Sequence, residues 1–224
     1  MGCTTKTGIK NPNEHNGGNR TPWSVTLSLT LTHLLRIHPV FLGGINVGSG
    51  NKPPWTLPAK AKYGTYDSKR AVKYFGTEQL VTPDFFPILS VVPQRAMLVV
   101  KDRHPREVFE NCFLDTWRCS FVTHVNIEKP EGLAKLLGAH FDENEVKEIM
   151  RLMTTKEYKD RLTQNTKDAL EQGAFGAPWF KLTNAQGVVE PLFGSDRWAY
   201  MWDFLGVDFE DIKIVDKTKG KAKL

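Results

Sequence analysis

The 224-residue sequence has only three cysteines, and their spacing argues against a disulfide. Cys3 lies near the N-terminus, whereas Cys112 and Cys119 lie seven residues apart in a helical pattern. Seven residues of α-helix span about 10.5 Å, and the two Cα atoms of a disulfide lie within roughly 7 Å of each other. No Cys-x-x-Cys occurs either. We therefore expect a reducing compartment, two buried thiols and no thiol–disulfide exchange by a paired site.

Long apolar segments are also missing. No run approaches the roughly 20 residues that a membrane-spanning helix needs, and the first twenty residues lack the apolar core of a secretory signal. The composition, 40% hydrophobic and 25% charged, is that of an ordinary soluble globular protein. We expect no membrane span.

The excess of positive charge is small and partly local. The formal net charge is +5, and residues 216–224 alone carry four lysines and one aspartate, a net of +3. The rest of the chain is close to neutral, and no basic face interleaved with aromatic residues is evident from the sequence. Because nucleic-acid binding proteins usually show such a face or a known reading motif, nucleic acid is not expected as a partner.

The two ends of the chain have the composition of tails. Residues 1–20 are rich in Asn and Gly and poor in apolar side chains, which predicts a disordered segment. The chain ends in Ala222-Lys223-Leu224, which resembles the peroxisomal address Ser-Lys-Leu. We expect a peroxisomal protein; a mitochondrial or cytosolic location, with a merely solvated basic tail, is the alternative.

The body of the chain reads as an apolar run, a helical block and a hairpin. Residues 37–45 form a short apolar run that predicts a buried strand. Helical patterns follow as far as about residue 172. We expect one helix to end at Gly76, one helical segment to begin at Thr82-Pro83 and another helix to begin at Pro105. Two further helices should begin at capping boxes, formed by Asp142 with Glu145 and by Thr154 with Glu157.

After the helical block the period changes to that of strands. Residues 178–184 and 188–194 predict a hairpin around the turn Asn-Ala-Gln-Gly, in which Gly187 supplies a positive φ. A helix should follow, with Ser195 or Asp196 as its N-cap and Gly206 at its end.

One stretch, "TPWSVTLSLTLT" at 21–32, supports two interpretations. Its last eight residues alternate apolar with Ser or Thr side chains, which is typical of a strand with one buried face. Its first four residues, "TPWS", resemble an active-site tetrapeptide, which should open a helix.

Four motifs in order resemble the kappa-class glutathione transferases, relatives of DsbA and of the hydroxychromene-carboxylate isomerases. They are "TPWS" at 21–24, "GNKPP" at 50–54, "GAFGAP" at 173–178 and "FGSDR" at 193–197. The resemblance implies an α/β thioredoxin-like (DsbA-like) fold interrupted by an inserted all-helical domain, in a homodimer. The expected organisation is a disordered tail (1–20), a thioredoxin-like domain (21–52 and 173–212), a helical insertion (53–172) and a basic tail (213–224).

The resemblance implies glutathione as cosubstrate, with a small electrophile or a peroxide as the second substrate and no metal. The family has Ser-Pro-aromatic-Ser at the N-terminus of a helix, where a hydroxyl and the positive helix end favour the thiolate. Thr21 takes the place of the first Ser, and Ser24 is a second hydroxyl. Pro22 and Trp23 complete this motif.

The other motifs imply contacts to the tripeptide. Asn51 matches a glutathione-contacting Asn, and Ala177 matches the residue whose backbone pairs with glutathione before the cis-proline, here Pro178. Ser195 and Asp196 match the contacts to the γ-glutamyl end. Asn51 also fits a plain turn residue, and Ser195 and Asp196 also fit plain N-capping residues.

The N-terminal region departs from the family pattern. The family has an apolar strand just before the tetrapeptide, but residues 13–20 read "NEHNGGNR", and the segment after it is rich in β-branched residues. Three functions follow as alternatives. The protein is a glutathione transferase, a catalytically impaired homologue that binds glutathione or a partner, or a glutathione-dependent isomerase.

Overall fold

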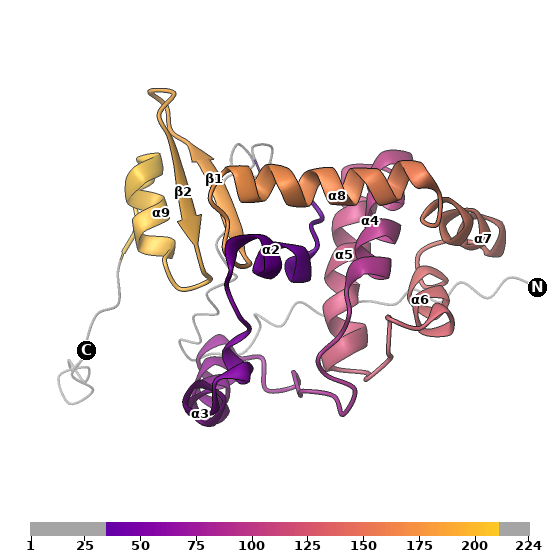
Figure 1. Ribbon diagram of the computed structural model, residues 1–224, viewed down its shortest axis with the longest axis horizontal. Coiled ribbons are helices and arrows are strands. Elements are labelled where there is room, and N and C mark those ends of the chain that lie inside the picture. Colours follow the sequence, from indigo (N-terminus) through magenta and orange to yellow (C-terminus); the bar gives the residue numbers. More distant parts are fainter. Residues whose placement is uncertain (1–34, 211–224) are drawn as a thin grey trace, which may run out of the picture.

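The computed structural model describes residues 35–210, which form a helical bundle beside a two-stranded hairpin with its own helix (Figure 1). The elements in chain order are α2 (Leu42–Ser49), the 3-10 helix η1 (Pro54–Thr56), α3 (Pro58–Phe75), α4 (Val91–Arg103), α5 (Arg106–Phe121), α6 (Pro130–Leu137), α7 (Glu143–Leu152), α8 (Lys156–Glu171), β1 (Trp179–Thr183), β2 (Val189–Phe193) and α9 (Trp198–Leu205). Within 35–210, no helix is long and apolar enough to cross a membrane. The predictions for residues 1–34 and 211–224 lie outside the described residues.

The main core lies among α4, α5, α6, α7 and α8. Helix α4 is central: five consecutive residues from Ala96 to Val100 are almost completely buried. Helix α6 contributes Leu133, Leu136 and Leu137, and α7 contributes Ile149. Because apolar burial is the main favourable contribution to folding, this bundle is the stable body to which the other elements are attached.

Polar contacts join the ends of these helices. Arg103 donates two hydrogen bonds to the Glu145 carboxylate, at 2.8 and 2.9 Å, and the His104 ring lies 2.8 Å from the same group. The arginine, followed by the histidine, lowers the pKa of Glu145 to about 2. A second pair joins His140 to Asp115 at 2.8 Å. These contacts fix α7 on α4, and the segment after α6 on α5.

The predicted strand over residues 37–45 is wrong. Residues 37–41 have no regular structure, and α2 begins at Leu42. Side chains of neighbouring helices bind the backbone of this segment, with Lys101 donating to the Ile37 carbonyl at 2.7 Å and Asn165 to that of Pro39 at 3.0 Å. Because these helices satisfy its polar groups, the apolar run needs no neighbouring strand.

Glycines explain why helix α2 forms where a strand was expected. A Cβ atom on Gly44 would lie 3.0 Å from a Thr166 methyl carbon, and one on Gly48 would lie 2.5 Å from a Leu170 methyl carbon. Tertiary packing of α2 on α8 therefore depends on bare glycine backbone and overrides local propensity.

The segment opened by Thr82-Pro83 is not a helix either, since the next helix begins only at Val91. Residue Pro87 follows a cis peptide bond from Phe86. A proline lacks the N–H that a helix needs and disfavours helical backbone in the residue before it, so prolines 83 and 87 keep this segment irregular.

The capping predictions are correct at one helix and displaced at another. Asp142 accepts a hydrogen bond from the Glu145 N–H at 2.9 Å and caps α7 as expected. The N-cap of α8 is Thr155 rather than Thr154, and neither hydroxyl caps it. Both donate back to carbonyls at the end of α7, those of Leu152 and Arg151, at 2.7 Å each.

The predicted hairpin is confirmed. Strands β1 and β2 pair antiparallel, with Trp179 opposite Phe193 and Thr183 opposite Val189. Gly187 has φ +77° in the turn, and Gly206 ends α9 with φ +67°. Helix α9 packs on one face of the hairpin, where the Phe180 and Trp198 rings meet edge to face at 5.7 Å.

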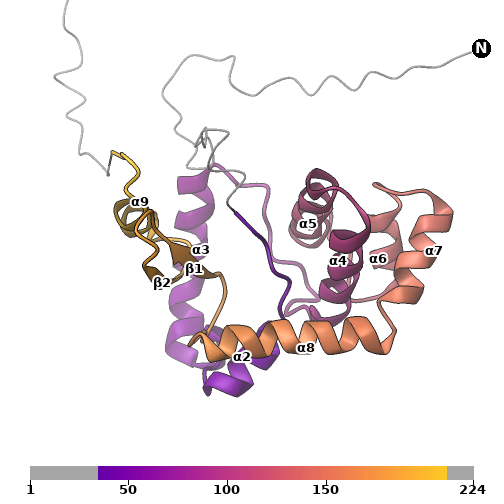
Figure 2. The ribbon, with the colours of Figure 1, turned by 90° about the horizontal axis from the view of Figure 1, so that it is seen from above.

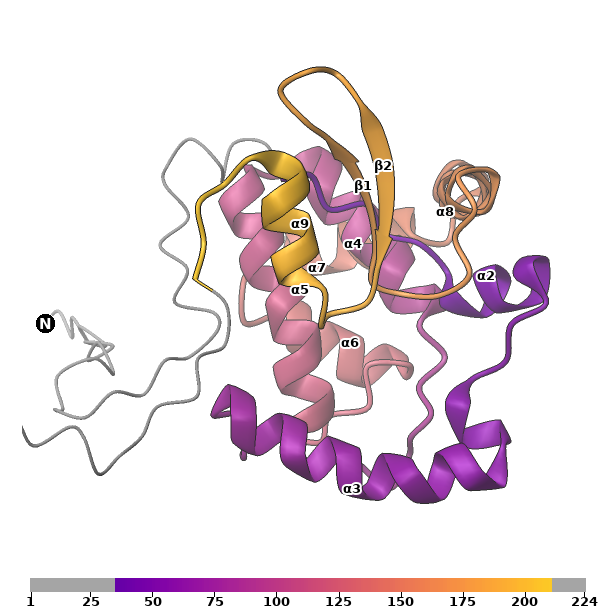
Figure 3. The same ribbon diagram turned by 90° about the vertical axis from the view of Figure 1, so that its left-hand side faces the viewer.

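Helix α3 also agrees with its prediction and ends at Gly76 in a left-handed conformation. It lies along the lower edge of the molecule (Figures 1 and 3). None of its 18 residues is fully buried, so α3 is the least embedded of the long helices.

We predict opposite effects of alanine at two glycines. A Cβ on Gly132, in the first turn of α6, would lie 2.0 Å from the Asn126 carbonyl oxygen, whereas nothing lies within 4 Å of one on Gly64 in α3. Gly132→Ala should lower the free energy of unfolding by about 1–3 kcal/mol, and Gly64→Ala should raise it by about 0.5–1 kcal/mol. Urea unfolding measures both, and equal effects at the two sites would contradict the packing of α6.

Candidate active site

The loop after α2 is tied to the segment before β1. The Asn51 side-chain amide donates a hydrogen bond of 2.6 Å to the Phe175 carbonyl, across 124 residues of sequence. The loop is also fixed locally, because the Ser49 hydroxyl accepts from the Asn51 N–H at 3.3 Å and donates to the Ile45 carbonyl at 2.7 Å. Asn51 therefore joins two of the motifs that are far apart in the chain.

The next residues along this segment present free backbone. The peptide bond between Ala177 and Pro178 is cis, and both residues are exposed. Neither the N–H nor the C=O of Ala177 is hydrogen-bonded to any other residue within 35–210. The Pro178 carbonyl accepts from the Gly194 N–H at 3.1 Å, which brings the turn that holds Ser195 next to Pro178.

Two glycines allow this close approach. A Cβ on Gly176 would lie 2.7 Å from the Phe193 ring, and Phe193 in turn packs against Phe175 with ring centroids 4.5 Å apart. Gly194 has φ +98°, and a Cβ there would lie 2.7 Å from a carboxylate oxygen of Asp196. Both positions need glycine, the first for space and the second for its backbone conformation as well.

The prediction that Ser195 or Asp196 caps α9 is wrong. The N-cap is Arg197, and no side chain caps the helix. Asp196 instead forms an exposed ion pair with Arg197 at 3.0 Å. The left-handed turn at Gly194 delays the start of the helix to Trp198, which leaves the Ser195 and Asp196 side chains outside it, on the exposed surface.

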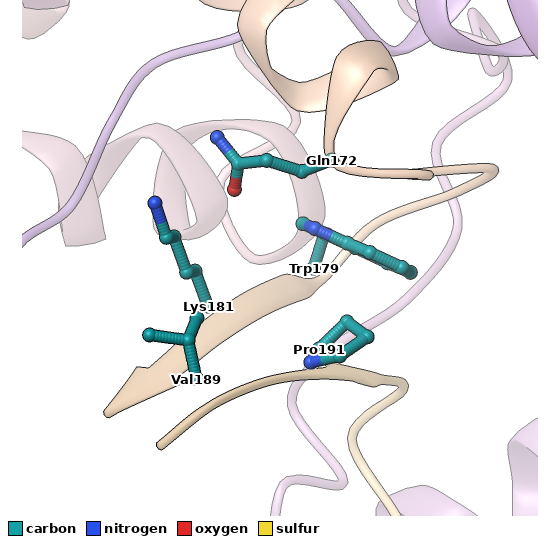
Figure 4. Close-up of a pocket in the computed structure, with 5 residues that line it drawn as sticks. All are labelled: Gln172, Trp179, Lys181, Val189 and Pro191. Carbon is teal, nitrogen blue, oxygen red and sulfur yellow. The ribbon is translucent and has the colours of Figure 1, made fainter. Parts of the chain in front are cut away.

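A pocket of about 210 Å³ lies on the face of the hairpin away from α9 (Figure 4). Side chains from the end of α8 and from both strands line it: Gln172, Trp179, Lys181, Val189 and Pro191. Within the described part of the chain, the buried indole N–H of Trp179 has no hydrogen-bond partner. The pocket adjoins the cis-proline, because Trp179 follows Pro178 directly.

The two described cysteines lie away from this site, on α5, and are unsuited to nucleophilic chemistry. Burial, followed by the charge of Asp115, raises the pKa of the Cys112 thiol to about 12 and also raises that of Cys119. Both thiols are free. Only a thiolate attacks well. Cys112 is buried as expected, whereas Cys119 is only half-buried. Residues 35–210 contain no cluster of side chains that could hold a metal ion.

Comparison with known proteins identifies the fold family. Residues 25–206 match the model of the DSBA-like thioredoxin domain. The chain belongs to this family. Unlike a disulfide oxidoreductase with a paired redox site, it has no Cys-x-x-Cys, so membership in the DsbA-like family does not imply thiol–disulfide exchange here.

Among curated proteins, this DsbA-like chain is similar to kappa-class glutathione transferases. It is 28% identical over 182 residues to glutathione S-transferase kappa 2 of Caenorhabditis elegans, which covers 79% of this chain and 80% of the relative. It is also 28% identical over 177 residues to human glutathione S-transferase kappa 1, over 77% of each chain. Both the resemblance and the thioredoxin-like fold class inferred from the motifs are confirmed.

A solved structure supports the fold independently. The structure of a 2-hydroxychromene-2-carboxylate isomerase superposes with a TM-score of 0.59 at 18% sequence identity, covering 76% of this chain and 79% of that one. At this identity the likeness concerns the fold alone.

The described part of the DsbA-like domain brings together one half of the predicted site. Asn51 is bonded to the segment of Ala177 and Pro178, and the turn of Ser195 and Asp196 is bonded to Pro178. Their role in binding stays a prediction. The predicted catalytic and neighbouring residues Thr21, Pro22, Trp23 and Ser24 lie outside the described residues.

The pocket on the hairpin was not among the features predicted from the sequence. Its strand residues Trp179 and Lys181 alternate along β1, and Lys181 lies opposite Pro191 in the hairpin. Period-2 alternation places such residues on one face, so this pattern could have identified the pocket wall before the structure was known.

Proposed function

We propose that this protein is a glutathione transferase of the kappa type. It activates the thiol of glutathione for conjugation to a small electrophile or for reduction of a peroxide. The observation that supports this most directly is the hydrogen bond from Asn51 to the Phe175 carbonyl, which holds the Asn-Lys-Pro-Pro loop beside the exposed backbone of Ala177. Relatives named as kappa-class glutathione transferases support the same assignment.

In this proposal the exposed backbone binds the tripeptide. The N–H and C=O of Ala177 pair with the extended backbone of glutathione, as an added strand pairs with a sheet edge. The Ser195 hydroxyl and the Asp196 carboxylate bind the charged γ-glutamyl end, where Asp196 accepts from the ammonium group. Arg197 orients the Asp196 carboxylate through their exposed ion pair at 3.0 Å.

Activation of the thiol is assigned to the hydroxyl of Thr21. This hydroxyl donates a hydrogen bond to the sulfur, which favours thiolate over thiol and so raises the fraction of nucleophile at neutral pH. The sulfur then forms a bond to the electrophilic carbon while the leaving group departs. Threonine differs from the family's serine by one methyl group, and Ser24 is the second hydroxyl of this motif.

Binding of glutathione tests the described half of the site. By isothermal titration calorimetry, Asn51→Ala and Asp196→Asn should each weaken glutathione binding by roughly 5- to 100-fold, because each removes a hydrogen bond that involves a polar or charged partner. The matched controls are Asn111→Ala and Asp203→Asn, whose exposed side chains have no hydrogen bond or ion pair to other residues of the described segment. Equal affinities for glutathione in all four variants would contradict the proposal that glutathione binds at this site.

Turnover tests the catalytic assignment. With a chloronitrobenzene as electrophile, Thr21→Ser should keep or raise kcat/KM, and loss of the hydroxyl in Thr21→Val should lower kcat/KM by about 10- to 1000-fold. If neither the natural protein nor Thr21→Ser turns over while both bind glutathione, the protein is the non-catalytic homologue. Isomerisation without a conjugate would instead favour the glutathione-dependent isomerase.

We further propose that the protein is a homodimer, as the resemblance implies. Sedimentation velocity at micromolar concentration should give a species of about twice the 25.4 kDa chain mass. A single 25.4 kDa species at all concentrations would contradict the dimer.

We also propose a peroxisomal location, supported by the terminal Ala222-Lys223-Leu224. A fluorescent protein fused ahead of the chain should enter peroxisomes, and deletion of Leu224 should leave it in the cytosol. An unchanged distribution after the deletion would favour the cytosolic or mitochondrial alternative.

A further inference from the structure

One helix of the described part of the chain is strongly basic. Helix α3 carries five cations and one acid, a net of +4, in a chain whose formal net charge is +5. The cations are Lys60, Lys62, Lys69, Arg70 and Lys73, and the acid is Asp67. The net charge of the whole chain does not reveal this helix, because cations and acids elsewhere nearly cancel.

Among the described residues, none of these five cations forms an ion pair. The helices of the bundle behave differently, since six of their cations are paired with an acid on the same helix. Those pairs are Arg106–Glu110, Arg118–Asp115, Lys147–Glu143, Arg151–Glu148, Lys156–Asp160 and Lys167–Glu171. Like charges one turn apart, such as Lys69 and Lys73, destabilise a helix slightly, so the unpaired cluster on α3 is unfavourable unless an anionic partner neutralises it.

Four of the five cations share one side of the helix, whereas Lys60 lies about 140° from Lys73 around the axis. At 100° per residue, Lys62, Lys69 and Lys73 fall within about 40° of one another around the axis, and Arg70 lies about 60° beyond Lys73. The opposite side faces the protein and holds the half-buried residues Ala61, Ala71, Val72 and Phe75. The basic face therefore points outward from Lys62 to Lys73.

Aromatic side chains accompany the cations on this face. Tyr63, Tyr66 and Tyr74 expose 58%, 55% and 60% of their surface. Just before the helix, Trp55 and Leu57 are also exposed, at 45% and 51%. Tyrosine and tryptophan favour the boundary between apolar and aqueous phases, because each has an apolar body and a polar tip.

We propose that α3 docks on a membrane surface rich in anionic phospholipid. Lysine and arginine clusters of this size on an amphipathic helix bind acidic headgroups, and the tyrosines together with Trp55 enter the headgroup region. Single-stranded nucleic acid also binds basic and aromatic surfaces, but in a groove that follows its backbone. Helix α3 lies along the lower edge of the molecule (Figure 3), on the side away from α7 (Figure 2), which suits contact with an extended flat surface. This inference does not depend on the proposed glutathione chemistry.

Vesicle flotation with the full chain tests the docking. The protein should bind vesicles of phosphatidylcholine with about 30% phosphatidylserine, should release them at high salt, and should ignore pure phosphatidylcholine. Replacing Lys62, Lys69, Arg70 and Lys73 together by glutamine should weaken binding by at least about 50-fold, since each cation near the surface contributes roughly 5-fold. Tyr63→Ala with Tyr66→Ala should weaken it less, by about 3- to 10-fold.

The matched control removes the same charge from paired positions: Lys147, Arg151, Lys156 and Lys167, each to glutamine. It should keep most of the affinity, although its net charge equals that of the α3 variant. Far-ultraviolet circular dichroism confirms that both variants are folded. Absence of vesicle binding, or equal loss in the two variants, would overturn the proposal. The face would instead bind nucleic acid if the protein bound a single-stranded oligonucleotide tightly and showed no preference for acidic vesicles. In that case only the α3 variant should lose oligonucleotide binding.

Discussion

The close packing of α2 on α8 is the constraint on which the candidate site depends. Gly44 and Gly48 let the short helix approach Thr166 and Leu170 more closely than any side chain would allow. Helix α8 runs across the top of the molecule from α7 to β1 (Figure 1), so an element fixed on its C-terminal half is also fixed relative to the hairpin. The Asn51 loop, directly after α2, is thereby held beside the cis-proline segment.

The hydrogen bonds around Pro178 extend this arrangement. The Asn51 amide binds the Phe175 carbonyl, and the Gly194 N–H binds the Pro178 carbonyl. Three segments, separated in the chain by the helical block and by the hairpin, thus converge on one exposed strip of backbone. Such an exposed strip of backbone suits the extended polar ligand of our proposal, the tripeptide glutathione.

Electrostatics separates the body of the protein from its periphery. In the bundle, most of the arginines are paired on their own helix or between helices, as Arg161 is with Asp102 and Arg103 with Glu145. Exposed pairs of this kind contribute little stability each, but they leave the bundle surface without a strong field. Helix α3 alone combines a net charge of +4 with side chains free of ion pairs within the described residues. The surface of the bundle and the surface of α3 therefore differ in charge, and the net charge of the whole chain does not show this difference.

Periodicity and end signals determined much of the fold from the sequence alone. The amphipathic helices after Pro105 and Asp142, the hairpin around Gly187 and the glycine ends at positions 76 and 206 follow from local rules, because each rule involves residues within a turn or two of one another. Four ordered motifs were enough to place the chain in its family.

Only the tertiary structure decided the rest. The apolar run 37–45 had the pattern of a strand, yet contacts with α8, more than 120 residues away, made its second half a helix. The pocket on the hairpin and the basic face of α3 likewise required knowing which side of each element is covered. Whether a side chain is paired, buried or open depends on neighbours that are remote in sequence, and local pattern carries no information about them.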